Sequence, residues 1–217
     1  MKKNTPKSIC LSACLLLSFA AWTALVRWVD VQPIGPDGST VGFATLNQYV
    51  HNITGVHLSL YIVTDWLGLV PIATALGFAA LGLVQWIKRK SLLRVDRSIL
   101  ALGVFYLAVI AAYVCFEIVV INYRPILIDG RLEASYPSST TMLVACVMPT
   151  AAMQLKGRIK NKLFGACVII AITVFIAFMV LCRLLSGVHW MTDIIGGAIL
   201  STALVLMYNG ACGAGEE

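Results

Sequence analysis

The chain contains two apolar runs of 20 residues each, LFGACVIIAITVFIAFMVLC (163–182) and HWMTDIIGGAILSTALVLMY (189–208), separated only by RLLSGV (183–188). An α-helix rises about 1.5 Å per residue, so about 20 apolar residues span the roughly 30 Å hydrocarbon core of a bilayer. Two such runs with a short connection predict two antiparallel membrane-spanning helices whose connected ends lie at one face of the membrane.

Similar apolar runs recur along the rest of the sequence. Of its 217 residues, 59% are hydrophobic and 12% are charged, whereas about 25% are charged in a typical soluble domain. The first run resembles a signal peptide but is long enough to be a retained transmembrane helix. We therefore predict an all-α integral membrane bundle of six transmembrane helices, in a single domain over residues 1–217. The six predicted spans are 9–29, 60–87, 99–121, 138–155, 163–182 and 189–208.

The basic residues indicate how this bundle is oriented. Twelve of the 16 Lys and Arg residues precede the first run or lie in 88–97 and 156–162, which six spans place on one side of the membrane. The positive-inside rule makes that side cytoplasmic, so both termini are predicted to be cytoplasmic in a cell-membrane protein. This orientation accounts for the net charge of +6, and no nucleic-acid partner is expected. The seven cysteines lie mostly in apolar runs and are interpreted as packing residues.

Three loops are predicted on the opposite, exoplasmic side: about 30–56, 122–137 and 183–188. In the first, a stretch ending at His57 mixes polar and apolar side chains. It forms either an interfacial helix that covers the mouth of a site or a plain surface loop. Four arginines lie on this side. Arg27 is interpreted as an interfacial anchor and Arg131 as a solvated residue, whereas Arg124 and Arg183 each adjoin the end of a span.

His189 and Asp193 are the ionisable residues of the last run. Their spacing of four places both side chains on one face of a helix, which Ser186 and Gly187 predict to begin just before His189. An ionisable residue in a span is costly and indicates a function by default. A carboxylate beside an imidazole fixes its tautomer and supports positive charge, as in a catalytic pair. A structural hydrogen bond at a helix start is the alternative interpretation.

A second helix start is predicted on the same side at YPSSTT (136–141). Small hydroxyl residues after a proline are typical of an ordinary helix cap, but the free N–H groups of a helix start also bind anions. Arg124 and Arg183 add planar guanidinium groups that suit phosphate oxygens. Two helix starts, two arginines and an oriented histidine together predict phosphoryl transfer with His189 as the nucleophile.

Three motifs resemble those of the type 2 phosphatidic acid phosphatase superfamily of membrane lipid phosphatases. That family has Lys-x6-Arg-Pro, Pro-Ser-Gly-His and Ser-Arg-x5-His-x3-Asp. The corresponding segments here are Glu117-x6-Arg124-Pro125, Pro137-Ser138-Ser139-Thr140 and Cys182-Arg183-x5-His189-x3-Asp193. Their order, spacing and predicted exoplasmic position agree with the family, and the six predicted spans extend the resemblance over most of the chain.

The resemblance implies an enzyme without metal or cofactor that removes phosphate from a lipid phosphate or prenyl diphosphate at the exoplasmic face. His189 would form a phosphohistidine intermediate, and Asp193 would orient it. The implied partners are a phosphorylated lipid and the bilayer. The other implied site residues are Arg124 and Arg183 for the phosphoryl oxygens, and Ser138, Ser139, Thr140 and Glu117 for substrate binding.

Two positions depart from the family pattern. Glu117 replaces a lysine, and Thr140 replaces the histidine that protonates the leaving group. Either the leaving group needs little protonation, as with a prenyl diphosphate, or Glu117 is the acid, or catalysis is lost or slow. A carboxylate beside a phosphate site also suggests a substrate with its own positive group, such as an amine.

These departures leave two classes of function. The first is an enzyme, either a lipid phosphatase or a phosphotransferase with another acceptor than water. The second is a catalytically impaired binding or scaffold protein that keeps the anion pocket. His189 and Asp193 favour the enzyme, because binding alone needs only the arginines, whereas Thr140 and Glu117 favour the second class.

Three further ionisable residues have open interpretations. His51 and His57 are either substitute acids or ordinary interfacial histidines. Asp65 lies in the outer half of the second predicted span, where it pairs with Arg27 or an arginine of the bundle, or lines the site.

Overall fold

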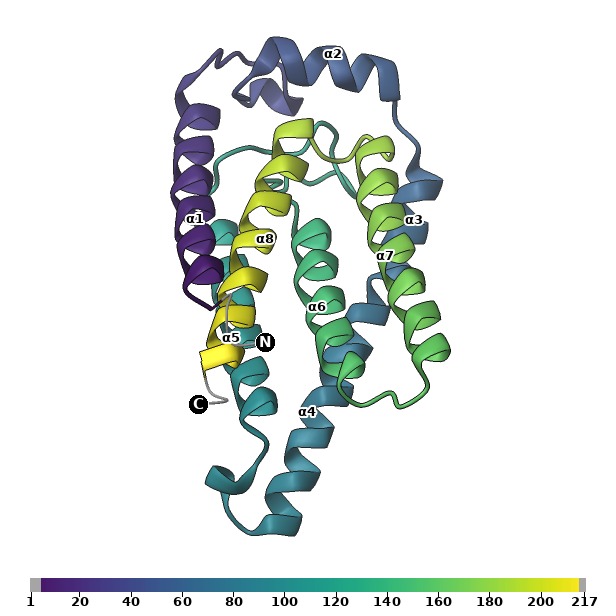
Figure 1. Cartoon of the computed structure of the whole chain (residues 1–217). Helices are drawn as coiled ribbons and strands as arrows, with labels where there is room; N and C mark the ends of the chain where they lie inside the picture. The colour runs from purple at the N-terminus through teal and green to yellow at the C-terminus, as the bar shows by residue number, and fades with distance from the viewer. Residues whose placement is uncertain (1–4, 215–217) are drawn as a thin grey trace.

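The structure, a computed structural model, describes residues 5–214 (Figure 1). Within these residues the protein is all-helical, apart from isolated β-bridges in the loops and two 3-10 turns, Pro36–Gly38 and Leu92–Arg94. The helices are α1 (Thr5–Trp28), α2 (Ala44–Thr54), α3 (Leu58–Leu67), α4 (Leu69–Arg89), α5 (Arg97–Ile118), α6 (Ser139–Lys156), α7 (Lys162–Leu185) and α8 (Met191–Ala214).

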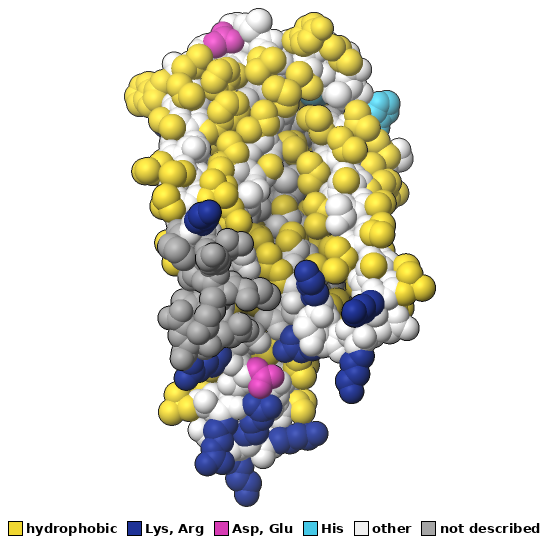
Figure 2. Space-filling model, viewed as in Figure 1, with side chains coloured by type: hydrophobic (Ala, Val, Ile, Leu, Met, Phe, Trp, Pro, Cys, Tyr) yellow, Lys and Arg dark blue, Asp and Glu magenta, His cyan; other side chains and the backbone are white. Residues whose placement is uncertain are grey.

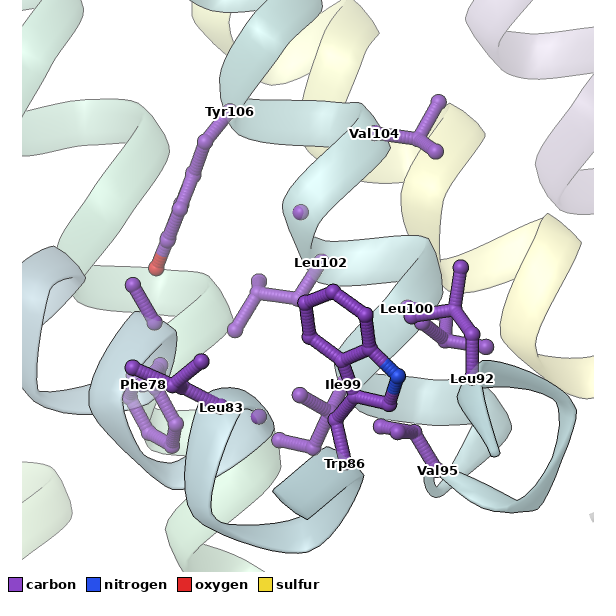
Figure 3. A pocket seen from close by; sticks show the side chains of 13 residues that line it. Phe78, Leu83, Trp86, Leu92, Val95, Ile99, Leu100, Leu102, Val104 and Tyr106 are labelled. Atoms are coloured by element: carbon purple, nitrogen blue, oxygen red, sulfur yellow. The ribbon is translucent and has the colours of Figure 1, made fainter. Parts of the chain in front are cut away.

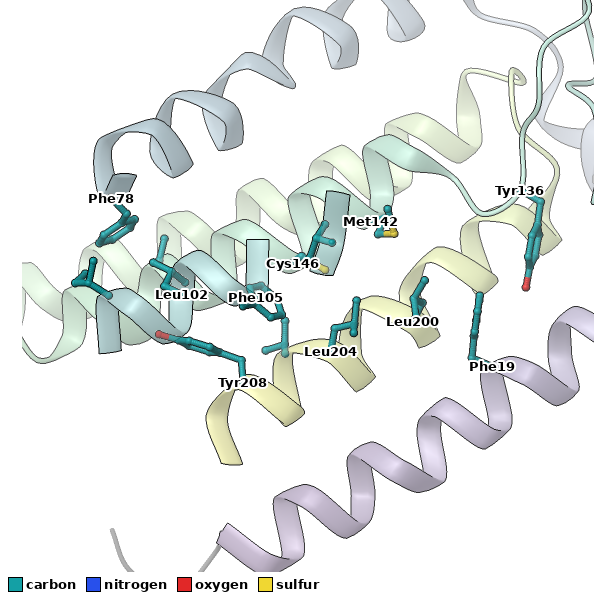
Figure 4. Packing of buried hydrophobic residues seen from close by; sticks show 14 of the residues in the cluster. Phe19, Phe78, Leu102, Phe105, Tyr136, Met142, Cys146, Leu200, Leu204 and Tyr208 are labelled. Atoms are coloured by element: carbon teal, nitrogen blue, oxygen red, sulfur yellow. The ribbon is translucent and has the colours of Figure 1, made fainter. Parts of the chain in front are cut away.

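The helices α6 and α8 form the centre of the bundle. α8 packs along α1, and α6 packs against α7 and α8. This arrangement places the first turns of α6 and α8 at the same end of the molecule (Figure 1). Aromatic and aliphatic side chains fill the core between α1, α5, α6 and α8 (Figure 4), among them Phe19, Phe105, Met142, Cys146, Leu200, Leu204 and Tyr208.

Five helical segments among the described residues are long and apolar enough to cross a membrane: Lys7–Trp28, Leu58–Arg89, Arg97–Ile118, Lys162–Leu185 and Met191–Cys212. α6 forms where a span is predicted at 138–155, but it is not one of the five. Half of its 18 residues are buried inside the protein, including Thr141, Thr150 and Gln154. Because other helices enclose much of α6, its sequence carries more polar residues than the outer helices do.

The predicted run 60–87 is bent, because α3 ends and α4 begins at Gly68. Pro71 has no N–H group, so the carbonyl of Leu67 lacks its usual helical donor. A Cβ at position 68 would lie 2.9 Å from the carbonyl oxygen of Asp65, so glycine permits the close turn. The bend allows α3 to pack against α7 while α4 packs against α5 and α6.

The stretch 41–57 contains a helix, α2, which lies across one end of the bundle (Figure 1). The Asp30 carboxylate accepts a hydrogen bond of 2.7 Å from the N–H of Thr45, which satisfies one of the free donors at the helix start. Of the two alternatives for this stretch, the structure has the helix and not the plain loop.

The two ends of the bundle differ in charge. Figure 2 shows Lys and Arg side chains gathered at the end where α4 connects to α5 and α6 to α7. Near that end, α4 and α5 enclose an open groove of about 880 Å³ lined by side chains that include Phe78, Trp86, Leu102 and Tyr106 (Figure 3). The described residues that line this groove carry no charge, so it does not suit a phosphate group.

Gly42→Ala is expected to destabilise the turn between α1 and α2. A Cβ at this position would lie 1.6 Å from the carbonyl oxygen of Val26, so the backbone would have to shift. The free energy of unfolding should fall by about 2 kcal/mol or more, as at other strained backbone positions. Thermal unfolding in detergent measures the change.

Gly77→Ala is the matched control, because a Cβ there meets no atom within 4 Å and alanine favours a helix. Its melting temperature should be unchanged or slightly raised. Equal losses in the Gly42 and Gly77 variants would contradict the packing of Gly42 on α1.

Candidate active site

His189 and Asp193 come together where α7 connects to α8. α8 begins at Met191, so the prediction that His189 lies in its first turn is wrong, and His189 lies in the connection. Gly187 makes the turn with a φ of 70°, and a Cβ there would lie 2.2 Å from the carbonyl oxygen of Gly55. The spacing of four still pairs the two side chains, since His189 Nδ1 is 3.7 Å from Asp193 Oδ2.

Asp193 is fully buried and is bonded to three segments. Its Oδ2 accepts a hydrogen bond from the N–H of Trp190 (3.0 Å), and its Oδ1 accepts one from Nδ2 of Asn122 (3.3 Å). Its backbone carbonyl accepts a hydrogen bond from the N–H of Ser138 (3.1 Å). Asp193 therefore holds the first turn of α8 beside the start of α6, as the two predicted helix starts require.

Arg124 determines the tautomer of His189. Its Nη1 lies 3.4 Å from His189 Nε2, and a guanidinium group can only donate, so Nε2 accepts. The neutral imidazole then carries its proton on Nδ1, on the side of Asp193. Burial lowers the pKa of His189 well below its ordinary value, and the charges of Arg124 and Arg183 lower the pKa further. The ring is thus held neutral, with the lone pair of Nε2 directed toward Arg124.

Each of the two arginines is held by a carboxylate. Arg124 Nε is 3.0 Å from Oε2 of Glu133, a residue of the same loop. Arg183 Nη1 donates to Thr64 Oγ1 (3.1 Å), and its Nη2 is 3.9 Å from Asp65 Oδ1. Of the alternatives for Asp65, the structure shows a pair with an arginine of the bundle. Both arginines are almost completely buried, so these partners keep their charges compensated.

A small, narrow cavity lies beside His189. Glu117, Ser135, Ser139 and His189 are among its lining residues. An open apolar groove of about 730 Å³ adjoins the cavity and is lined by Ile72, Val109, Ile110, Tyr113, Ser139, Thr140, Met142 and Leu143. The cavity and groove share Tyr113, Ser139 and Met142. The structure thus places Ser139 and Glu117 with His189, whereas Thr140 lines the groove.

Several buried polar atoms at this site have no hydrogen-bond partner in the described structure: Ser135 Oγ, Ser138 Oγ, Arg183 Nε and His189 Nδ1. Buried polar atoms are normally paired, so each exception needs an explanation. Of these residues, Ser135 and His189 line the cavity, and Ser138 directly precedes Ser139, which also lines it. Most of these atoms can donate a hydrogen bond, so they suit a ligand that is rich in acceptor oxygens.

Three residues at the site are missed by sequence reasoning. Asn122 and Ser135 lie in the loop that carries Arg124, and only their nearness to that arginine marks them in the sequence. Tyr61 lies under Arg183, whose Cζ is 4.7 Å from the centre of the ring. The sequence alone marks Tyr61 as an ordinary interfacial tyrosine. The bend at Gly68, which directs α3 onto α7, cannot be read from the sequence.

Residues 5–214 hold no group of three or more His, Cys, Asp or Glu side chains that could bind a metal ion. The site is instead built from two arginines, small hydroxyl residues and one buried histidine–aspartate pair.

Residues 119–211, which contain these two arginines and the His189–Asp193 pair, match the family model described as the PAP2 superfamily. This region belongs to the PAP2 superfamily. The resemblance inferred from the three motifs is therefore confirmed. None of the curated proteins that were compared matches the chain.

One PAP2 crystal structure shares the fold of this chain. It is the first transmembrane PAP2 type phosphatidylglycerolphosphate phosphatase from Bacillus subtilis, which is 21% identical with a TM-score of 0.58. The match covers 93% of this chain and 95% of that chain. Together with the five apolar helices, this likeness identifies an integral membrane protein.

In this chain, α2 holds the connection that carries His189. Asn47 accepts from the N–H of Thr192 (3.2 Å) and donates to Thr192 Oγ1 (2.9 Å). His51 Nε2 lies 3.2 Å from the carbonyl oxygen of Gly187, and its ring packs against Trp190 with centroids 5.5 Å apart. Neither His51 nor His57 is among the residues that line the cavity.

Asn47→Ala is expected to lower the free energy of unfolding by about 1–3 kcal/mol, because the buried polar atoms of Thr192 lose their partner. Gln48→Ala is the matched control on the same helix, since Gln48 bonds only to Asn52 one turn later, at the surface. Denaturant unfolding of both variants measures the difference. Losses of equal size would show that α2 does not hold the connection through Asn47.

Proposed function

We propose that the protein is a membrane lipid phosphatase that removes phosphate from a lipid phosphate or prenyl diphosphate through a phosphohistidine at His189. The observation that carries this proposal is the group of buried, unpartnered polar atoms on Ser135, Ser138, Arg183 and His189, with Arg124 Nη1 3.4 Å from His189 Nε2. Phosphoryl oxygens accept hydrogen bonds from arginine and serine donors. The PAP2 match over the same site supports the same class of reaction.

The first step is attack of His189 Nε2 on the phosphorus of the substrate. The bond between phosphorus and the leaving oxygen breaks, and its electron pair stays on that oxygen. Asp193 stabilises the positive charge gained by the imidazole, and Arg124 and Arg183 exchange their carboxylate partners for phosphoryl oxygens. In the second step, water attacks phosphorus, the phosphorus–nitrogen bond breaks, and orthophosphate and neutral His189 are formed.

The leaving group decides how much acid catalysis the site needs. Thr140 is not an acid at ordinary pH. A prenyl diphosphate suits the site because a phosphate monoester leaves without a full proton. Glu117 is the second candidate for the acid, because it lines the cavity with His189. A phosphotransferase would share the first step and use another acceptor than water in the second.

We further propose that α6 is the sixth span, beside the five apolar segments, in one domain over residues 1–217. The basic end of the bundle (Figure 2) is then cytoplasmic with both termini, and the site faces the exoplasmic side of the cell membrane. The apolar groove that adjoins the cavity suits the hydrocarbon chain of a lipid. A lipid in the outer leaflet would thereby reach His189 without leaving the bilayer.

Phosphate release by the purified protein tests the proposal, with phosphatidic acid, phosphatidylglycerol phosphate and a prenyl diphosphate as substrates. His189→Gln is expected to lower release to background, because it removes the nucleophile. Arg124→Ala should lower kcat/KM by about 100-fold or more, as loss of a charged transition-state contact does. A labelled phosphate that stays on the protein at alkaline pH and is lost in acid would identify phosphohistidine.

Arg131→Ala is the matched control, because Arg131 is an exposed arginine of the loop that carries Arg124. Its activity should equal that of the unchanged protein. Release that persists in His189→Gln would contradict the mechanism. No release from any substrate, with lipid binding retained, would instead favour the binding or scaffold function.

The lowered pKa of His189 predicts the pH profile. The neutral imidazole is the nucleophile, so kcat should stay level as the pH falls to the ordinary histidine pKa of about 6.5 and decrease only well below it. Saturating substrate is needed, because a phosphate monoester itself titrates near pH 6, roughly. A kcat that is halved at the ordinary histidine pKa would show that burial does not hold His189 neutral.

A further inference from the structure

We propose that the groove between α4 and α5 binds one anionic phospholipid, with an acyl chain in the groove and the phosphate held by Lys88 and Arg94. The groove lies near the basic end of the bundle, and none of the residues that line it also lines the cavity beside His189. The proposal requires an integral membrane protein and does not depend on the phosphatase function, so either can fail without the other.

The groove has a buried apolar floor and exposed apolar walls (Figure 3). Phe78 and Leu102 are almost completely buried at its floor, whereas the side chains of Trp86 and Val104 are largely exposed. All of its lining residues come from the segment 78–106, so among the described residues no other helix closes it. The groove is therefore open toward the bilayer, where a hydrocarbon chain can fill it without burying a polar group.

The turn between α4 and α5 lies at the level of the lipid headgroups. Leu92 and Leu93, in the 3-10 turn Leu92–Arg94, are 53% and 92% exposed. Exposed leucines are costly in water but are stabilised at the boundary between hydrocarbon and headgroups. Because basic residues flank these leucines on both sides, their charged groups lie at the level of the lipid phosphates.

The basic residues of this turn carry more positive charge than the turn compensates. Arg89 pairs with Asp96 at 2.8 Å, and Asp96 is the acidic residue of the stretch 88–97. Lys88, Lys90 and Arg94 are exposed and form no ion pair with any described residue. A phosphate can thus bind here without displacing a carboxylate, in contrast to the two arginines of the site around His189.

The chain itself brings two of these cations to the end of the groove. Arg94 lies between Leu92 and Val95, which both line the groove, and Lys88 follows the lining residue Trp86 by two positions. A phosphate that contacts both cations lies over the end of the groove, and an acyl chain of the same lipid can enter it. A second copy of the chain suits this surface less well, because its own basic turn would lie in the same leaflet and repel this one.

Two lipids with the same acyl chains test the proposal. Dioleoyl phosphatidylglycerol is anionic, whereas dioleoyl phosphatidylcholine has no net charge. In native mass spectrometry of the purified protein, one molecule of phosphatidylglycerol is expected to be retained with an affinity about tenfold higher or more, the size of one charged hydrogen bond. Equal retention of the two lipids by the unchanged protein overturns the proposal, and this comparison needs no variant.

A charge variant tests the headgroup contacts. Lys88→Gln with Arg94→Gln is expected to remove the preference for phosphatidylglycerol. Lys160→Gln with Lys162→Gln is the matched control, because these exposed lysines lie at the same basic end of the bundle but in the α6–α7 connection, which lines no part of the groove (Figure 2). Equal losses in both variants would show a general attraction of anionic lipids to the basic end, and no site at the groove.

A second variant tests the acyl-chain contact. Gly103 lines the groove, and a Cβ there meets no atom within 4 Å, so Gly103→Leu adds a side chain that occupies the groove. Retention of phosphatidylglycerol should fall about tenfold. Gly77→Leu is the matched control on α4, because Gly77 has the same open surroundings but does not line the groove. Equal retention by the two glycine variants overturns the proposal.

Thermal unfolding in detergent without added lipid separates loss of binding from loss of folding. The melting temperatures of all four variants should match that of the unchanged protein, because the altered residues are exposed. Added phosphatidylglycerol should then raise the melting temperature of the unchanged protein but not of the Lys88→Gln, Arg94→Gln protein, as a ligand of the folded state does. Dimers that form in place of lipid binding and disappear in Gly103→Leu would assign the groove to a second copy and overturn the proposal.

Discussion

The fold around the site depends on the bonds of one buried residue, Asp193. A buried carboxylate is costly unless hydrogen bonds compensate its charge, and here the donors come from Trp190 and Asn122. Its main-chain carbonyl also receives the first free N–H before α6, from Ser138. The start of α8, the start of α6 and the loop after α5 are therefore fixed together. Because His189 precedes α8 by two residues, its ring can only lie within this junction.

The second constraint is the burial of two arginines in a protein surrounded by lipid. Each needs a partner of opposite charge, and each takes it from a different place: Arg124 from its own loop through Glu133, and Arg183 from α3 through Asp65. The bend at Gly68 is necessary for the second pair, because it directs α3 against α7. The charge compensation of Arg183 therefore depends on the bend between α3 and α4.

Periodicity and hydropathy were enough to predict the all-helical membrane fold and most of the long helices to within a few residues. They also placed Arg124, Arg183, His189 and Asp193 on one side of the predicted membrane, whereas the convergence of Arg124 and His189 could be expected only from the family motifs. Those residues have sharp local signals, since they are charged groups at the ends of apolar runs. The start of α8 was misplaced because Ser186 and Gly187 form the turn before it rather than its cap. The partners Asn122, Thr64 and Glu133 could not be predicted, because hydrogen bonds between distant segments depend on bends and loop paths that leave no periodic pattern.

The pairing of each arginine with a carboxylate has a consequence for the product as well as for the substrate. In the proposed mechanism, a phosphoryl group that enters the site displaces Glu133 from Arg124 and Asp65 from Arg183, so the site exchanges one anion for another. The free energy of binding orthophosphate is then the difference between two sets of ion pairs, not the full strength of either. When orthophosphate leaves, the carboxylates close onto the arginines again. If the proposed mechanism holds, the carboxylates of the site compete with the product for the arginines, which would favour release of orthophosphate as it accumulates.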